Sequence, residues 1–113
     1  MKKVEAVLRP DSVDSVLSAL EDAGYPGVMI TEVEGHGRQK GITQQWRGQE
    51  YKVALLPKVK VELVVHDNEV NTIIQRITSV AKTGQIGDGK IFVCDVSEAV
   101  RIRTGERGDA ALN

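Results

Sequence analysis

The chain has 113 residues, which is enough for one domain built around a single hydrophobic core. Its 15 basic and 16 acidic residues leave a formal charge of −1, which excludes the bulk attraction that brings strongly basic proteins to nucleic acid or to anionic membranes. No apolar run approaches the roughly 20 residues that span a bilayer, and a strand pattern begins at Lys3 without room for a signal peptide. We therefore expect a cytoplasmic protein with no nucleic-acid partner and no direct membrane insertion.

Hydrophobic periodicity predicts two βαβ units in chain order. The strands are expected at residues 3–9, about 28–34, 59–65 and 91–95. The first helix is expected to open at residues 10–12 and to stop at Gly24, and the second to follow Asp67 or Asn68 and to run to about Val80. A short helical piece is expected near residues 97–100, and the polar end from residue 101 is expected to be loosely held.

The two halves of the chain repeat. A shift of 57 positions places Val61 on Val4, Glu62 on Glu5 and the apolar stripe of the second helix on that of the first. A doubled βαβ unit is the ferredoxin-like arrangement, an α+β fold with a four-stranded antiparallel sheet and both helices on one face. We therefore expect one ferredoxin-like domain over residues 1–113.

The sheet face opposite the helices is expected to be partly apolar. It should carry Val7 and Val64 together with either the pair 91/93 or the pair 92/94 of the last strand. An apolar face of this size is seldom left in water. We therefore expect a homo-oligomer that buries this face and has clefts between its subunits.

Residues 35–58 form an unusually long connection between two strands. Hairpin loops normally have two to five residues, and long structureless loops are usually functional or disordered. This one is rich in Gly, Gln, Arg and Lys, and it holds Trp46 and Tyr51, two of the four aromatic residues of the chain. Aromatic residues on a loop are typical of a contact surface. We interpret the loop as a mobile arm that binds a partner; a tolerated surface insertion is the alternative.

Residues 82–90 form a loop with several glycines that ends at Lys90. Such glycines allow backbone N–H groups to converge on an anion. Arg101 and Arg103 would point to the same side of an extended segment, and Arg38, Lys40 and Lys58 flank the long arm. Together these cations indicate a triphosphate site, although the loop taken alone is also compatible with a plain turn.

An enzyme is difficult to assemble from this sequence. His36 and His66 lack Cys or carboxylate partners at metal-ligand spacing, and no Ser/His/Asp set has local support. Cys94 is the lone cysteine, which excludes an intrachain disulfide, and it is expected to be buried in its strand. We expect a non-catalytic sensor. A small nucleotide-hydrolysing enzyme on the same fold and an amino-acid-binding regulatory domain are the rival interpretations.

Five motifs at matching separations give a resemblance that covers almost the whole chain. They are Arg38-Gln39-Lys40-Gly41, Arg47-Gly48-x-Glu50-Tyr51, residues 56–60, residues 83–92 and residues 101–105. In these motifs the chain resembles the PII nitrogen-regulatory proteins of the GlnB/GlnK type. The resemblance implies a homotrimer that senses energy and carbon/nitrogen status. It also implies a T-loop at about residues 37–55, a nucleotide loop at 82–90 and a C-terminal loop at 101–113.

The resemblance also implies ligands and the residues that hold them. ATP or ADP would bind Met29, Gly37, Arg38, Gln39, Glu62, Val64, Gly87, Asp88, Gly89, Lys90, Arg101 and Arg103. In the presence of Mg-ATP, 2-oxoglutarate would bind Gln39, Lys40, Gly41, Lys58 and Gly87. Gln39 would be a ligand of Mg²⁺, a role that suits a neutral oxygen donor. Met29 departs from the family, in which many members have threonine at this position.

The T-loop residues imply the partner. Arg47 matches the residue that GlnK-type members insert into the cytoplasmic mouth of an ammonium transporter, which is the leading interpretation. Regulation of glutamine synthetase or of another nitrogen-metabolism protein is the alternative. Tyr51 matches the residue that some members have uridylylated or adenylylated, and Gln49 replaces the serine that others phosphorylate.

Overall fold

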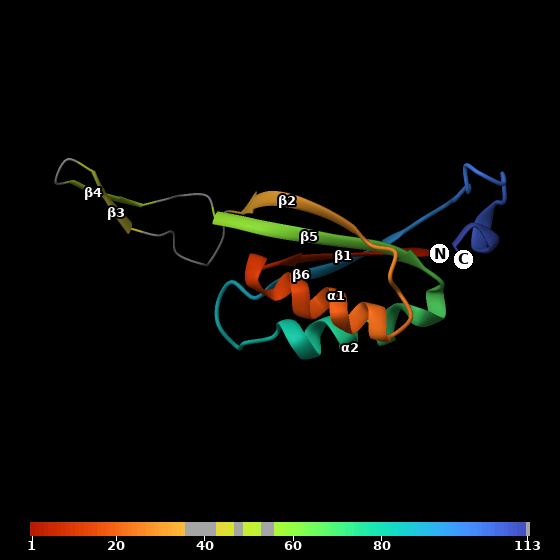
Figure 1. The fold of residues 1–113 in the computed structure, drawn as a ribbon, viewed down its shortest axis with the longest axis horizontal. Helices are drawn as coiled ribbons and strands as arrows, with labels where there is room; N and C mark the ends of the chain where they lie inside the picture. Colours follow the sequence, from red (N-terminus) through yellow and green to blue (C-terminus); the bar gives the residue numbers. More distant parts are fainter. Residues whose placement is uncertain (36–42, 47–48, 53–55, 113) are drawn as a thin grey trace.

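The computed structural model describes residues 1–35, 43–46, 49–52 and 56–112 (Figure 1). Its strands are β1 (Lys2–Leu8), β2 (Met29–Gly35), β3 (Thr43–Trp46), β4 (Gln49–Lys52), β5 (Leu56–Val65) and β6 (Gly89–Asp95). Its α-helices are α1 (Val13–Asp22) and α2 (Val70–Ala81), and 3-10 helices cover Pro10–Ser12, Asp67–Glu69 and Gly108–Leu112.

Strands β1, β2, β5 and β6 form a four-stranded sheet in the order β2-β5-β1-β6. All three neighbouring pairs are antiparallel. Helices α1 and α2 lie side by side on one face of this sheet (Figure 1). The ferredoxin-like double βαβ fold is thereby confirmed.

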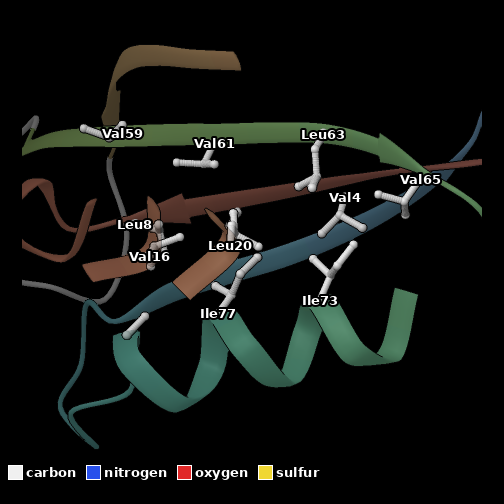
Figure 2. Close-up of a cluster of buried hydrophobic side chains, with 12 residues drawn as sticks. Val4, Leu8, Val16, Leu20, Val59, Val61, Leu63, Val65, Ile73 and Ile77 are labelled. Atoms are coloured by element: carbon white, nitrogen blue, oxygen red, sulfur yellow. The ribbon is translucent and has the colours of Figure 1, made fainter. Parts of the chain in front are cut away.

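The core lies between the sheet and the two helices (Figure 2). Every second residue is buried from Val4 to Leu8 in β1 and from Val59 to Val65 in β5, as expected for strands that have one face on the core. The helices supply residues at helical spacing, and four of them are at most 1% exposed: Val16, Leu20, Ile73 and Ile77. Burying a side chain of this kind contributes about 1.5–3 kcal/mol, so this layer fixes the helices on the sheet.

Local signals set the ends of α1. Pro10 begins the 3-10 turn that precedes the helix, where its missing N–H is not needed. At the other end Gly24 has a φ of +94°. Its N–H donates to the carbonyl of Glu21, and the N–H of Tyr25 donates to that of Leu20. This pair of bonds is a Schellman motif, so the predicted stop at Gly24 is confirmed.

The strand register shows which residues of β6 lie on the open face of the sheet, the face opposite the helices. Phe92 pairs with Glu5 and Cys94 pairs with Lys3, and partners across an antiparallel ladder share a face. Ile91 packs against the core instead. The open face therefore carries the 92/94 pair beside Val7. Cys94 is exposed, so the expectation that it is buried is wrong for this chain.

The structure differs from the sequence prediction at two points in the long connection between β2 and β5. Strand β5 begins at Leu56 rather than at Val59, and Leu56 is only 8% exposed. Within the connection, β3 and β4 pair from Thr43 with Lys52 to Trp46 with Gln49. The expectation of a structureless loop is therefore wrong for residues 43–46 and 49–52. The side chains of this hairpin lie outside the described part of the structure.

The structure also differs from the sequence prediction at two points near the end of the chain. Residues 96–99 have no regular secondary structure, so the predicted helical piece at 97–100 is wrong. The Glu98 carboxylate accepts hydrogen bonds from the N–H groups of Ala99 and Gly108 instead. Val100 forms an isolated bridge with Arg107, and a 3-10 helix follows. This end is a hydrogen-bonded hairpin rather than a loosely held segment.

Candidate functional site

The glycine-rich loop lies where several strand ends meet. Leu8, the last residue of β1, pairs with Gly89 at the start of β6 and with Val59 of β5. The end of β2 lies beside the start of β5, where Gly35 pairs with Leu56. The topology therefore brings the loop, residue 9, the base of β5 and the end of β2 to one end of the sheet (Figure 1).

The carboxylate of Asp88 organises the loop from within. It accepts hydrogen bonds from the Thr83 N–H at 2.8 Å, from the Gly84 N–H at 2.9 Å and from the Thr83 hydroxyl. The Thr83 hydroxyl, the Thr83 and Gly84 amides and the nearby Arg9 lower the pKa of Asp88 from 3.8 to about 2. The carboxylate is therefore ionised at neutral pH, and it faces its own loop.

Two cations hold the carbonyl groups of the same loop. Arg9 donates from Nη2 to the Ile86 carbonyl at 2.7 Å and lies 3.5 Å from Oδ1 of Asp88. Lys58 donates from Nζ to the Gly87 carbonyl at 3.0 Å. Burial lowers the pKa of Lys58, and the charge of Arg9 lowers it further.

Gly89 permits the loop to join the sheet. Its φ is +104°, and a Cβ at this position would lie 1.8 Å from the carbonyl oxygen of Val7. Only glycine avoids both the strain and this contact. The backbone of β6 therefore begins directly against β1, and Lys90 follows on the open face opposite Val7.

The structure brings some of the predicted site residues together and separates others. Gly87, Asp88, Gly89, Lys90 and Lys58 gather at the loop end of the sheet. Met29 pairs with Glu62 on the open face, where Glu62 lies 3.6 Å from Lys3 and 3.2 Å from Lys60. Val64 lies on the same face of β5, opposite Lys3.

Arg101 and Arg103 follow the C-terminal end of β6, whereas the glycine-rich loop precedes its first residue. The segments before and after β6 lie at opposite ends of the sheet (Figure 1). Residues 102–104 form a turn, so the condition under which both arginines would point to one side, an extended segment, is not met. Arg101 donates to the Glu106 carboxylate at 2.8 Å and to the Ala110 carbonyl at 3.2 Å. Within one chain these arginines and the loop do not form one site.

Several predicted residues lie outside the described part of the structure. They are Gly37, Arg38, Gln39, Lys40, Gly41 and Arg47. The backbone of Tyr51 belongs to β4, and its side chain is likewise not described. The described residues contain no group of three or more His, Cys, Asp and Glu side chains placed to hold a metal ion. None of the helices in the described ranges has the length and apolar character that a membrane crossing requires.

Arg9 is a site residue that the sequence did not predict. Its only local signal is a cation between the end of a strand and a proline. Its partner in the loop is a backbone carbonyl 77 positions away. The direction of that carbonyl depends on the folded loop, so no pattern in the sequence reveals it.

Comparisons with known proteins agree with this geometry. Residues 1–106 match the family model described as nitrogen regulatory protein P-II. The chain is 54% identical to nitrogen regulatory protein P-II 1 of Escherichia coli, over 99% of this chain and 100% of that protein. It is 52% identical to nitrogen regulatory protein P-II 2 of Methanothermobacter thermautotrophicus, over 99% and 97% of the two chains. The chain therefore belongs to the P-II family of nitrogen regulatory signal proteins, which are non-catalytic signal transducers.

Proposed function

We propose that this P-II protein senses adenine nucleotides and 2-oxoglutarate and regulates an ammonium transporter through residues 37–55. The family binds nucleotide and 2-oxoglutarate effectors. The observation that carries the proposal for this chain is the ordered loop at residues 82–90, in which Asp88, Arg9 and Lys58 fix the backbone around Gly87. A preformed loop of this kind is suited to an anionic ligand.

The active form is proposed to be a cytoplasmic homotrimer. Two features of the single chain support an assembly. Its open sheet face carries Phe92, 49% exposed, and Met29, 56% exposed, beside other apolar residues. Its glycine-rich loop and its C-terminal arginines lie at opposite ends of β6. A cleft between two copies brings such separated groups to one ligand.

ATP or ADP is proposed to bind in that cleft. The phosphates would contact Gly37, Arg38 and Gln39 with the loop residues Gly87–Lys90 of one protomer, and Arg101 and Arg103 of the next. Backbone amides and arginine forks suit phosphate oxygens. The carboxylate of Asp88 already accepts three hydrogen bonds from its own loop, so Asp88 is proposed to serve the ligand through its backbone. Met29, Glu62 and Val64 would contact the base.

The second effector is proposed to be 2-oxoglutarate bound beside Mg-ATP. Gln39 would contribute an oxygen to the Mg²⁺ shell, while Lys40, Gly41 and Gly87 would surround the keto acid. Lys58 is proposed to contact its distal carboxylate; the hydrogen bond from its ammonium group to the Gly87 carbonyl supports this, because it puts the cation at the loop. Ligand state would then select the conformation of the T-loop.

Two site variants test the shared cleft. Lys90→Ala removes a loop cation, and Arg103→Ala removes a C-terminal cation. Each homotrimer should lose ATP binding by isothermal titration calorimetry. When both chains are co-expressed with different tags and mixed trimers are isolated, one cleft in each trimer combines an intact Lys90 with an intact Arg103. Mixed trimers should therefore regain one ATP site. No recovery, with wild-type trimers binding normally, would refute a site shared between protomers.

Transporter regulation needs a separate experiment. Tagged wild-type protein and Arg47→Glu would be used to capture partners from native membranes and lysate, with ADP compared against ATP plus 2-oxoglutarate. The expected result is nucleotide-dependent capture of an ammonium transporter by the wild type and loss of capture by Arg47→Glu, with ATP affinity unchanged. Capture of glutamine synthetase in its place would refute the transporter assignment.

A further inference from the structure

Arg9 connects the end of β1 to the middle of the glycine-rich loop. The residue follows Leu8, the last residue of the strand, and precedes the 3-10 helix of Pro10–Ser12. Its side chain is 21% exposed. Nη2 lies 2.7 Å from the Ile86 carbonyl oxygen and 3.5 Å from Oδ1 of Asp88. One guanidinium group therefore contacts both the backbone and the carboxylate that order the loop.

The contact with Ile86 sets the direction of the next amide. A peptide unit is planar and trans, so its C=O and N–H point in opposite directions. The carbonyl of Ile86 is held on Arg9, and the N–H of Gly87 belongs to the same peptide unit. That N–H is consequently turned away from Arg9. Lys58 holds the following carbonyl, that of Gly87, at 3.0 Å, and the N–H of the same peptide unit, that of Asp88, donates to the Gln85 carbonyl at 3.4 Å.

The contact with Asp88 has an electrostatic consequence. An ionised carboxylate inside an anion-binding loop repels the ligand. Thr83 and Gly84 stabilise this carboxylate by hydrogen bonds, and Arg9 brings an opposite full charge to within 3.5 Å of it. Arg9 therefore reduces the negative potential at the position that a phosphate would approach.

The position of Arg9 has a cost that calls for an explanation. Its Nε atom is buried and has no hydrogen-bond partner among the described residues. Buried donors are nearly always paired, and an exception needs a reason. An arginine held in this orientation gains two contacts at Nη2 and gives up one at Nε. A residue selected only to fill space beside the sheet would not need a guanidinium group.

We propose that Arg9 is a positioning residue for the nucleotide site: it turns the Gly87 N–H outward through the Ile86 carbonyl and neutralises Asp88. The inference rests on the proposed nucleotide binding at this loop. Arg9 itself touches the loop rather than the ligand. Its removal should therefore weaken ATP and ADP alike, because the altered loop serves the phosphates that the two nucleotides share.

Three variants separate positioning from folding. Arg9→Met removes the charge and the donors, Arg9→Lys retains one charged donor, and Arg76→Met makes the same chemical change on α2, away from the loop. ATP and ADP affinities would be measured by isothermal titration calorimetry on trimers. The Gly87 amide would be followed by NMR, and thermal unfolding would report the folded fraction.

Arg9→Met is expected to weaken both nucleotides at least tenfold and to shift the Gly87 amide resonance in the ligand-free protein. Arg9→Lys should recover at least half of the loss on a logarithmic scale, and Arg76→Met should bind as the wild type does. Folded Arg9→Met with wild-type affinity, or Arg9→Lys no better than Arg9→Met, would overturn the proposal. Failure of the wild type to bind ATP would instead overturn the proposed function.

Discussion

Substitution of Gly89 by alanine tests how closely the glycine-rich loop is joined to the sheet. Gly89 pairs with Leu8 at the first position of β6. A Cβ added there would lie 1.8 Å from the Val7 carbonyl oxygen and 2.9 Å from its carbon. Gly84, in the same loop, has a φ of +84° but nothing within 4 Å of its Cβ position. Gly84→Ala is therefore the matched control.

The two variants share one cost and differ in another. Alanine at positive φ costs about 1–2 kcal/mol, partly offset by about 0.4–1 kcal/mol from a less flexible unfolded chain. In Gly89→Ala the oxygen of Val7 must also retreat from 1.8 Å to at least 3.0 Å. That movement separates the ends of β1 and β6, with loss of a ladder hydrogen bond worth about 1 kcal/mol and a similar loss of packing. We expect Gly89→Ala to be about 2 kcal/mol less stable than Gly84→Ala.

Urea unfolding at one fixed protein concentration measures this difference, since the stability of an oligomer depends on concentration. A difference of about 2 kcal/mol corresponds to a roughly thirtyfold change in the unfolding equilibrium. ATP titration of the folded variants adds a second readout, because only Gly89→Ala displaces the start of the strand. Equal midpoints for the two variants would refute the close approach of β6 to β1.

Three further results are expected. Ile73→Ala empties a fully buried core position and should cost about 2–5 kcal/mol in urea unfolding, whereas Val80→Ala, on the exposed side of the same helix, should change stability by less than about 0.5 kcal/mol. The ionised Asp88 carboxylate stabilises the fold because its pKa is lower in the folded chain than in the unfolded one. This contribution should be complete above pH 3.8 and lost as the pH falls toward about 2. The free energy of unfolding should therefore vary less across this pH range in Asp88→Asn than in the wild type. Glu106→Gln removes the exposed carboxylate that contacts Arg101, and calorimetry should show ATP binding two- to fivefold tighter, the scale of an exposed ion pair; weaker binding would show that Glu106 positions Arg101 for the ligand.

Much of the fold could be predicted because burial repeats along the chain. Alternating apolar residues show which face of β1 and β5 packs on the core, and residues at helical spacing show the buried face of α1 and α2. The repeat between the two halves of the chain indicates the double βαβ topology. The first residue of β5 could not be predicted in the same way, because Pro57 interrupts the strand pattern. Leu8, the last residue of β1, pairs with Val59, so Pro57 has only β2 beside it and no donor is missed on the other side. An edge-like position of this kind tolerates proline.

The site could be predicted in composition but not in geometry. Gly89 and Lys90 were identified from glycine spacing and charge, which are local properties. The contact of Arg9 with Ile86 and that of Glu98 with Gly108 join residues that are distant in sequence through backbone groups. Backbone groups are the same at every position, so sequence gives no signal of which one a side chain reaches. The predicted helix at 97–100 failed for this reason, because a tertiary hydrogen bond occupied the acidic residue.

The two carboxylates near the proposed phosphates are expected to respond differently to a ligand. Asp88 is 23% exposed and accepts three hydrogen bonds from its own loop beside Arg9. Glu106 is 45% exposed and contacts Arg101, an ion pair worth little in water. A polyphosphate can offer Arg101 two strong oxygen acceptors, so under the proposed function it would displace Glu106 at small cost. It would not replace Asp88 without breaking the hydrogen bonds that order the loop. Nucleotide binding should therefore rearrange the C-terminal hairpin and leave residues 83–89 in place.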